Sequence, residues 1–386
     1  MAENNQRLRL AMLGGGDGAL IGGVHRIAAR MDDRYELVAG VFAPDPAANR
    51  QFARTLGLAE ERVYADYQTL LQAEAERPDG AEVVAIATPN HLHFPMALAA
   101  LQAGLHVVCE KPMTLTVEEA EALARAAGES DREFLLMHNY VGYPLVQHAR
   151  EMVASGQIGK LISVQVEYVQ EWLTEEPAAD NKQAAWRLDP EKAGAAGCLG
   201  DIGTHAFHLA RFITGEPVSA VSADLVSHVP GRVLDDNVQA LLRFEGGARG
   251  SLWASQTAPG HENALRIRVI GDKASLHWQQ EAPNELLYAP LNAPAQRITR
   301  RDDLLGNAVG RSIRIPGGHP EGYLEAFANL YQALADRVRS GQSVAWLPGV
   351  EAGVEGMRFV EAALQSSQAD GRWTAIRPVD TAAGRR

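Results

Sequence analysis

A glycine-rich turn near the N-terminus constrains the fold of this chain more than any other feature. In the stretch LAMLGGGDGALIGGVHRIAAR (10–30), a short apolar segment runs into a loop with six glycines within residues 14–23, and a helical pattern follows. Such a turn between the first strand and first helix of a βαβ unit gathers backbone N–H groups at a helix N-terminus, where a pyrophosphate binds. A flexible loop without a ligand is the competing interpretation, but the place between strand and helix favours a dinucleotide site.

The glycine spacing can be aligned with the dinucleotide fingerprint in two registers. Gly14 and Gly16 supply the first two positions, and strict counting puts Ala19 in the third. An insertion of three residues, Asp17 to Ala19, would instead put Gly22 in the third position, with His25 three residues later. We expect His25 to brace the first helix behind the loop and to do no chemistry. The cofactor contacts predicted in this loop are Gly14, Gly15, Gly16, Gly18 and Ala19.

The first 140 residues alternate apolar strand signals with helical patterns, which predicts βαβ units and a doubly wound parallel sheet. Thr116, with Glu119 three residues later, forms a capping box at the start of one helix. The strands are expected at 8–13, 35–43, 81–89, 105–112 and 133–139, and the helices after residue 23 and at 46–57, 94–104 and 116–128.

After residue 140 the pattern changes to long polar–apolar alternation, which is typical of an antiparallel sheet with one solvated face. We therefore expect an α+β domain over 141–386 to follow a dinucleotide-binding domain over 1–140. Residues 279–318 show no clear period and are predicted to form a long loop, before two C-terminal helices near 320–340 and 348–367. The alternating segments are 161–172, 218–229, 237–245, 248–257, 263–271 and 274–278.

Composition excludes several classes of partner. The formal net charge of −12 disfavours a nucleic-acid surface or an anionic membrane as partner. The N-terminus carries no apolar run of signal-peptide type, and no segment approaches the ~20 apolar residues of a membrane span. Two cysteines, Cys109 and Cys198, are too few for a disulfide scaffold, so a cytoplasmic, reducing location is expected.

Two further motifs stand at the carboxyl ends of predicted strands, the edge at which open α/β sheets bind ligands. They are ATPNHLH (87–93) and CEKP (109–112). The Lys111 ammonium can hydrogen-bond a substrate oxygen there, although an ordinary surface lysine is the alternative. The cofactor contacts predicted from these motifs are Thr88, Pro89, Asn90, His93, Glu110 and Lys111.

The end of the second strand bears on the choice of nucleotide. The fingerprint expects an acid there for the ribose 2′-hydroxyl, but the position holds Ala43, and Asp45 follows two residues later. Asp45 is the candidate for this role. NAD is favoured over NADP because no arginine stands immediately beside the strand end, and NADP stays open.

In the second domain, GCLGDIGTHAFHLARFITG (197–215) holds a carboxylate and an imidazole four residues apart at the start of a helix. Asp201 and His205 then share a face, and a carboxylate beside an imidazole suits a general base. Three alternatives stand beside this one: Asp201 only caps the helix, His205 and His208 pack in the core, or Asp201 and His205 belong to a metal site. The last lacks any typical zinc spacing.

Taken together, the glycine loop with His25, ATPNHLH, EKP and GDIGTHAFHLARFITG resemble the Gfo/Idh/MocA family of NAD(P)-dependent oxidoreductases, over nearly the whole chain. The insertion at Asp17–Ala19 and the missing acid at Ala43 depart from the family pattern. The resemblance implies a Rossmann domain and a domain with a large open, mostly antiparallel sheet. Residues 167–172, 186–205 and 318–330 are similar to members acting on pyranose sugars, such as levoglucosan dehydrogenase.

The resemblance implies a catalytic group of Lys111, Asp201 and His205. His205 would take the proton of a secondary hydroxyl, Lys111 would hold its oxygen, Asp201 would orient the pair, and a hydride would pass to nicotinamide. The substrate is expected to be a sugar or cyclic polyol, and the family implies a homodimer or homotetramer. Ordinary packing is the alternative role for the predicted substrate contacts, which are Tyr140, Tyr168, Trp172, Trp186 and Arg187.

Two other functions remain compatible with the same fold. Some relatives use NAD transiently to hydrolyse glycosides through a keto intermediate, and these produce no net NADH. A non-enzymatic NAD(P)-sensing regulator is the other. Such a regulator is expected to have lost the Lys111 or His205 equivalents, and both are present here.

Overall fold

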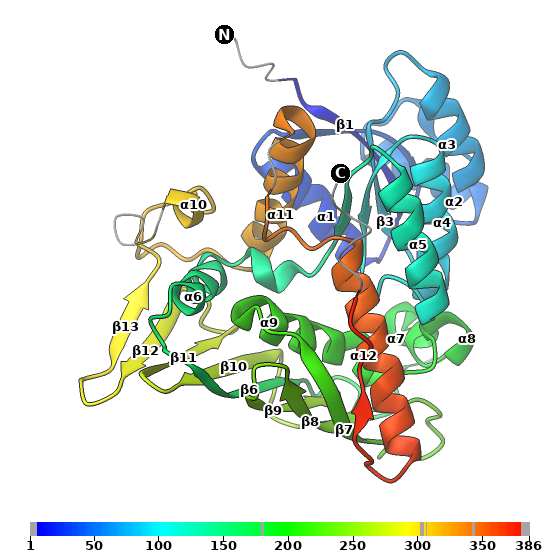
Figure 1. Cartoon of the computed structure of the whole chain (residues 1–386). Helices are drawn as coiled ribbons and strands as arrows, with labels where there is room; N and C mark the ends of the chain where they lie inside the picture. Colours follow the sequence, from blue (N-terminus) through cyan, green and yellow to red (C-terminus); the bar gives the residue numbers. More distant parts are fainter. Residues whose placement is uncertain (1–5, 179–180, 302–304, 306, 342–343, 380–386) are drawn as a thin grey trace. The chain divides into compact units, whose positions relative to one another are not determined.

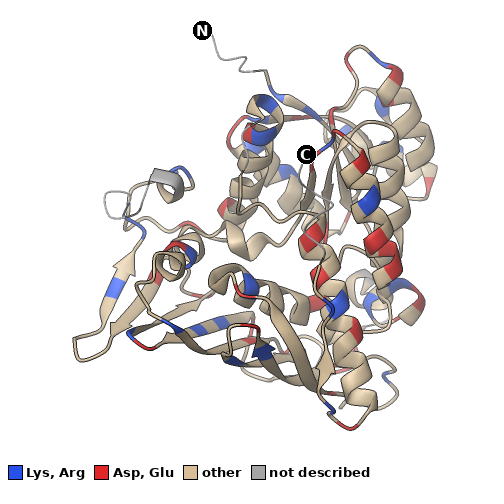
Figure 2. Cartoon of the chain, in the orientation of Figure 1, with Lys and Arg blue, Asp and Glu red and all other residues tan. Residues whose placement is uncertain are grey.

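The computed structural model describes residues 6–178, 181–301, 305, 307–341 and 344–379, and it divides the chain into two compact units. The first contains the described residues of Met1–Met137 and Phe327–Val354. The second contains those of His138–Ala326 and Glu355–Val379. Figure 1 draws both with their elements labelled, and Figure 2 shows acidic and basic residues interspersed along the helices of each.

The first unit is built on a five-stranded parallel sheet in the order β2-β1-β3-β4-β5. The central strands are buried on both faces, because helices lie on both sides of such a sheet. The strands are β1 (Leu8–Gly14), β2 (Tyr35–Val41), β3 (Val83–Ala87), β4 (His106–Cys109) and β5 (Phe134–Leu136). The helices are α1 (Leu20–Met31), α2 (Pro46–Thr55), α3 (Tyr67–Glu76), α4 (His93–Gln102) and α5 (Val117–Glu129).

The predicted parallel sheet and the capping box are confirmed. Thr116 Oγ1 accepts a hydrogen bond from the Glu119 amide at 3.2 Å, and the Glu119 carboxylate accepts one from the Leu115 amide at 3.0 Å. The sequence analysis did not predict α3. Asp66 caps this helix by accepting from the Thr69 amide.

The second unit contains a nine-stranded sheet in the order β13-β12-β11-β10-β6-β9-β8-β7-β14. Every pair is antiparallel except β6 with β9, which run parallel. Helix α9 (Thr204–Thr214) packs against β6, β9 and β10 and against α6 (Pro144–Ala154), as Figure 1 shows. The strands are β6 (Leu161–Val169), β7 (Val218–Val226), β8 (Asn237–Phe244), β9 (Arg249–Ser255), β10 (Ala264–Gly271), β11 (Ala274–Gln279), β12 (Glu285–Pro290), β13 (Gln296–Thr299) and β14 (Thr374–Ala375).

Two predictions are wrong. The region 279–318 is not one long loop, because it contains β12 and β13 as well as the short helix α10 (Asn307–Gly310). β13 is the edge strand of the sheet and β12 is its neighbour, and both bury few side chains, so their alternation is weak in the sequence. The boundary at residue 140 also fails for the C-terminal part, since Phe327–Val354 belongs to the first unit. The two predicted C-terminal helices are present as α11 (Tyr323–Ser340) and α12 (Val350–Gln368).

Close packing between the first helix and the glycine turn decides between the two fingerprint registers. A Cβ on Gly22 would lie 2.2 Å from the Gly15 Cα, so only glycine fits there. This close approach of helix and turn is the role of the third fingerprint glycine. The structure therefore favours Gly22 over Ala19, which is the N-cap residue of α1.

Replacing Gly22 by alanine should lower thermal stability, because backbone would have to move away from the new methyl group. Overpacking of this kind costs about 1–3 kcal/mol. Gly23→Ala is the matched control, since a Cβ there would meet only the Arg26 guanidinium at 3.9 Å and alanine favours helix by about 1 kcal/mol. Thermal melts of both variants check this, and equal melting temperatures would contradict the close-packing role.

Candidate active site

The protein's own packing requires most glycines of the turn. A Cβ on Gly14 would lie 2.4 Å from the Ala87 carbonyl oxygen, and one on Gly16 would lie 2.4 Å from that of Phe42. Gly18, by contrast, has no atom within 4 Å of its Cβ position and a φ of +74°. Most glycines of the loop are thus needed so that β1, β2, β3 and α1 can pack closely together. Gly18 is the position at which the backbone is open.

The start of α1 fits an anionic ligand. Its N-cap residue, Ala19, offers no side-chain cap, and its first turn holds no acidic residue. Helices α2, α3 and α5 of the same unit are instead capped by Asp45, Asp66 and Thr116. No side chain caps this end of α1, and the helix dipole favours a phosphate there.

Several predicted cofactor contacts have other partners in the first unit. Asp45 Oδ1 accepts from the Ala48 amide at 2.7 Å as the N-cap of α2. His93 is fully buried, with Nδ1 2.7 Å from the Pro112 carbonyl oxygen and Nε2 3.0 Å from that of Thr88. Burial lowers the pKa of His93, so the neutral ring donates its one N–H to one of these carbonyls. A cofactor contact by the His93 ring is not supported.

Glu110 is likewise occupied within the protein. Its Oε1 lies 3.0 Å from His25 Nε2, and its Oε2 accepts from the Lys111 amide at 3.2 Å. Burial acts to raise the pKa of Glu110, but the hydrogen bond and charge interaction with His25 outweigh it, so the pKa is lowered. The Glu110 carboxylate therefore has a structural role within the first unit. Lys111 is the one residue of the EKP motif that is partly exposed.

In the second unit, Asp201 and His205 lie where a π-helical turn, Leu199–Gly203, runs into α9. Such turns inside helices are frequent at functional sites. Asp201 does not cap the helix, because Asp235 accepts from the Gly197 and Leu199 amides at 2.7 Å each. Asp201 Oδ2 instead accepts from Gln256 Nε2 at 2.9 Å and from Arg187 Nε at 3.3 Å. The capping alternative is therefore wrong.

Aromatic rings surround His205. The ring of Tyr140 lies 4.9 Å from that of His205, and the ring of Tyr168 lies 6.1 Å away. Tyr140 donates to the Tyr168 hydroxyl, Tyr168 donates to Asn263 Oδ1 at 2.8 Å, and Asn263 Nδ2 donates back to Tyr140 at 3.5 Å. Burial raises the pKa of Tyr168 well above its usual value, so this hydroxyl stays a donor.

Arg187 links the remaining predicted substrate residues to Asp201. Its guanidinium lies 4.2 Å from the centre of the Trp186 ring and 6.0 Å from that of Trp172. Stacking of this kind holds the planar cation in place while it binds a carboxylate. The second unit therefore holds two sets of contacts, one joining Asp201 to Arg187 and the two tryptophans and the other joining His205 to the two tyrosines. Asp201 and His205 connect the two sets, because they lie four residues apart on consecutive helical turns.

Sequence reasoning missed Gln256 and Asn263. Gln256 directly follows β9, and β9 runs parallel to β6, so the carboxyl ends of both strands meet at one edge. The amide of Gln170, which follows β6, accordingly donates to the Ser255 carbonyl at 2.8 Å. A polar residue immediately after each strand was the available signal. It could not be used without knowing that these two strands pair in parallel.

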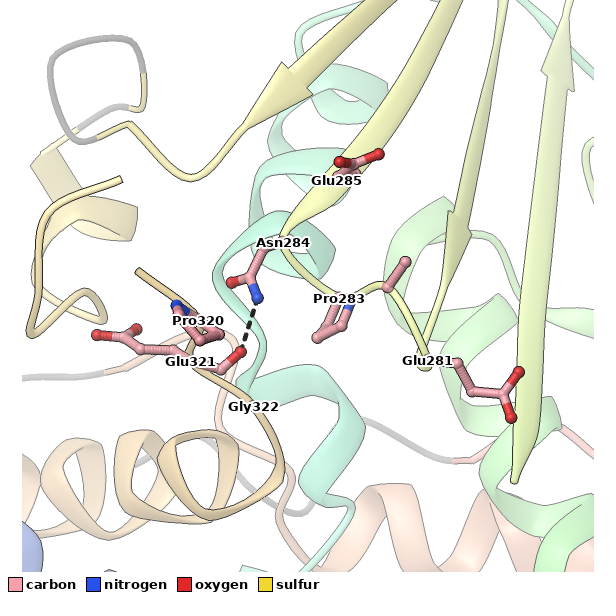
Figure 3. A pocket seen from close by; sticks show the side chains of 8 residues that line it. Glu281, Pro283, Asn284, Glu285, Pro320, Glu321 and Gly322 are labelled. Carbon is pink, nitrogen blue, oxygen red and sulfur yellow. Dashed lines mark hydrogen bonds between the residues drawn. The ribbon is translucent and has the colours of Figure 1, made fainter. Parts of the chain in front are cut away.

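A pocket in the second unit borders this group, because Glu281 in its lining accepts a hydrogen bond from the Asn263 amide at 3.3 Å. It lies where residues 281–285 meet residues 320–322, and Asn284 there donates to the Glu321 carbonyl at 2.9 Å (Figure 3). Buried Arg300 joins both segments, through Asn284 Oδ1 at 2.9 Å and Glu321 Oε2 at 3.1 Å. This pocket is a structural junction between β12 and the segment that leads to α11.

An uncapped helix start framed by glycines in a parallel sheet is the arrangement of a dinucleotide-binding unit. The chain belongs to the Gfo/Idh/MocA oxidoreductase family. Residues 8–138 match the model for the oxidoreductase family with an NAD-binding Rossmann fold, and residues 146–277 match the GFO/IDH/MocA C-terminal domain. NAD is thus the cofactor of the first unit.

The relatives cover most of the chain. An uncharacterised oxidoreductase of Bacillus subtilis is 34% identical over 95% of this chain and 96% of its own. Levoglucosan dehydrogenase of Pseudarthrobacter phenanthrenivorans is 32% identical over 76% and 78%. The crystal structure of an inositol dehydrogenase homologue from Azotobacter vinelandii, complexed with NADH and myo-inositol, superposes with a TM-score of 0.90 at 38% identity, over 96% and 98%.

Histidine packing in the core, one of the alternatives above, applies to His208. Its ring stacks on that of His138 at 4.0 Å, and burial, with the charges of Arg211 and Arg150 behind it, lowers the pKa of His208 to about 3. The unfolded chain takes up a proton on this group below pH ~6.5, whereas the folded chain does so only near pH 3. His208 therefore makes folding less favourable as the pH falls from 6.5 towards 3.

We expect His208→Phe to reduce the acid sensitivity of the fold. Between pH 7 and 5 the wild type should lose about 2 kcal/mol of unfolding free energy that the variant keeps, because each pH unit below 6.5 is worth about 1.4 kcal/mol per proton. Urea unfolding of both proteins at the two pH values measures the difference. An equal loss in both would show that His208 is protonated in the folded state.

Proposed function

We propose that this protein is an NAD-dependent dehydrogenase that acts on a secondary hydroxyl of a pyranose sugar or cyclic polyol. The observation that carries the proposal is the group around His205, in which a held carboxylate, an imidazole and a set of aromatic rings and hydroxyl groups lie together. Ring faces suit the C–H faces of a cyclic polyol, and the polar groups suit its hydroxyls. The relatives named for levoglucosan and inositol support the same substrate class.

The division of labour we propose uses Lys111, Asp201 and His205 on one hydroxyl. His205 accepts the hydroxyl proton, since an imidazole has a pKa near working pH. Lys111 donates a hydrogen bond to the same oxygen and stabilises the negative charge that develops there. Asp201, held by Arg187 and Gln256, orients the imidazole and the substrate. When bound, the nicotinamide supplies the hydride acceptor.

Tyr140, Tyr168, Trp172, Trp186 and Arg187 are proposed as the substrate-binding residues. Trp172 is 37% exposed, whereas Tyr140 and Tyr168 are buried. The set therefore combines a solvent-accessible aromatic ring with two buried, hydrogen-bonded hydroxyl groups. The backbone of Gly14, Gly15, Gly16, Gly18 and Ala19, with Thr88, Pro89 and Asn90, is proposed to contact NAD.

We also propose an oligomeric state and a location for this protein. Leu241 and Leu287 are 54% and 42% exposed on the sheet of the second unit, and a second copy of the chain would cover them in a homodimer or homotetramer. Gel filtration at micromolar concentration tests this, and a monomer would contradict it.

Both cysteines are buried and free, which accords with the cytoplasmic location expected from sequence. No helix in the described part of the chain combines the length and apolarity of a membrane span.

The proposal predicts that NADH absorbance grows when the protein receives NAD and a suitable pyranose, anhydrosugar or inositol. The same panel with NADP, and with 3-keto sugars and NADH, fixes the nucleotide and the reversible reaction. His205→Ala should lower turnover by ~10²–10⁴, the usual contribution of a general acid–base group, and leave NADH affinity nearly unchanged. Loss of NADH binding in this variant would contradict the assignment of His205.

Silence across the panel combined with tight NADH binding would overturn the dehydrogenase proposal. Release of free sugar from glycosides without net NADH would then identify a hydrolase that uses NAD transiently. Binding with neither activity would identify an NAD-sensing regulator.

A further inference from the structure

A line of buried hydrogen bonds in the first unit ends at the backbone of Lys111. Tyr331 Oη lies 2.7 Å from His25 Nδ1, His25 Nε2 lies 3.0 Å from Glu110 Oε1, and the Lys111 amide lies 3.2 Å from Glu110 Oε2. His25 is 0% and Tyr331 1% exposed, and Glu110 is also buried. The line therefore runs through the interior, from α11 through α1 to the segment after β4.

The charge of Glu110 fixes the direction of the two bonds at its end of the line. Burial raises the pKa of Tyr331 far above its usual value, so its hydroxyl keeps its proton where it forms a hydrogen bond with His25 Nδ1. The pKa of Glu110 is lowered, so its carboxylate is ionised and can only accept. His25 Nε2 therefore carries a proton and donates to the Glu110 carboxylate, and the Lys111 N–H completes the line.

The surroundings hold each member of the line in place. The ring of Phe327 packs edge-on against His25 at 5.4 Å. The Glu110 amide donates to the Ile86 carbonyl at 3.0 Å, which fixes the residue before Lys111 to β3. On the other side, the Pro112 carbonyl lies 2.7 Å from His93 Nδ1.

We propose that Tyr331, His25 and Glu110 are positioning residues that set the Lys111 backbone, and so the direction in which its ammonium group is presented. This inference rests on the proposed function for its effect on turnover, although the geometry itself lies wholly within the first unit. A lysine side chain is flexible, because it has four rotatable bonds. A fixed backbone at Lys111 therefore limits the region that the ammonium group can reach around its substrate oxygen.

The sequence makes Lys111 easy to follow. The chain has only five lysines, at 111, 160, 182, 192 and 273, against thirty-one arginines. The rate at which formaldehyde and a borohydride methylate each amine can therefore be read by peptide mass spectrometry, with Lys160 and Lys273 as internal references. This readout needs no substrate.

Tyr331→Phe and Glu110→Gln test the proposal, and Tyr35→Phe is the matched control. Tyr35→Phe removes one buried tyrosine hydroxyl from the same cluster but leaves the line to Lys111 intact. We expect kcat to fall about three- to tenfold in Tyr331→Phe and about 10–100-fold in Glu110→Gln, with the KM for NAD within twofold. Methylation of Lys111 alone should become at least threefold faster in both, while Tyr35→Phe matches the wild type in kcat and labelling.

The two readouts separate failure of this inference from failure of the proposed function. If Tyr331→Phe behaves like Tyr35→Phe in both kcat and Lys111 labelling, the positioning role is overturned. If Lys111 labelling changes as expected but no sugar or polyol is oxidised by the wild type, the positioning stands and the proposed reaction fails. The double variant Tyr331→Phe/Glu110→Gln should cost less than the product of the single effects, because both act on one line.

Discussion

The ionised carboxylate buried at Glu110 is the constraint on which the first unit depends. A buried charge is tolerated only when donors surround it, because its desolvation costs several kcal/mol. Here the donors come from α1, through His25, and from the adjacent backbone, through the Lys111 amide. Tyr331, from a distant part of the chain, forms a hydrogen bond with His25 Nδ1 and so orients the ring whose Nε2 donates to Glu110. Satisfying one charge thus ties the glycine-turn helix, the end of β4 and a C-terminal helix together.

Local patterns in the sequence predicted the parallel sheet, its helices and the glycine turn, because two-sided apolar runs and caps are short-range signals. Long-range pairing could not be predicted in the same way. Nothing local distinguishes β6 and β9, which run parallel, from their antiparallel neighbours, so Gln256 escaped notice as a partner of Asp201. The same limit explains why Phe327 and Tyr331, ordinary members of an apolar helix stripe in sequence, were not assigned to the first unit.

The candidate site was predicted better by residue type than by role. Asp201, His205, Arg187 and the four aromatic residues do lie together in the second unit, but through contacts that sequence could not specify. Several motif residues in the first unit have roles other than the predicted ones. Asp45, His93 and Glu110 stand in the positions expected of cofactor contacts, yet they cap a helix, pack beside backbone carbonyls and bind a buried histidine. A motif identifies residues that a site needs, and many of them position the residues that contact the ligand.

The assignment of Phe327–Val354 to the first unit has a consequence for how the protein is made. His25 and Glu110 leave the ribosome early, but Tyr331 follows only after the strands of the second unit have been synthesised. At usual elongation rates of about 5–20 residues per second, the buried carboxylate waits on the order of 10–40 s for its last partner. The nascent first unit must therefore remain incomplete, with this cluster open to water, until the second is nearly all translated.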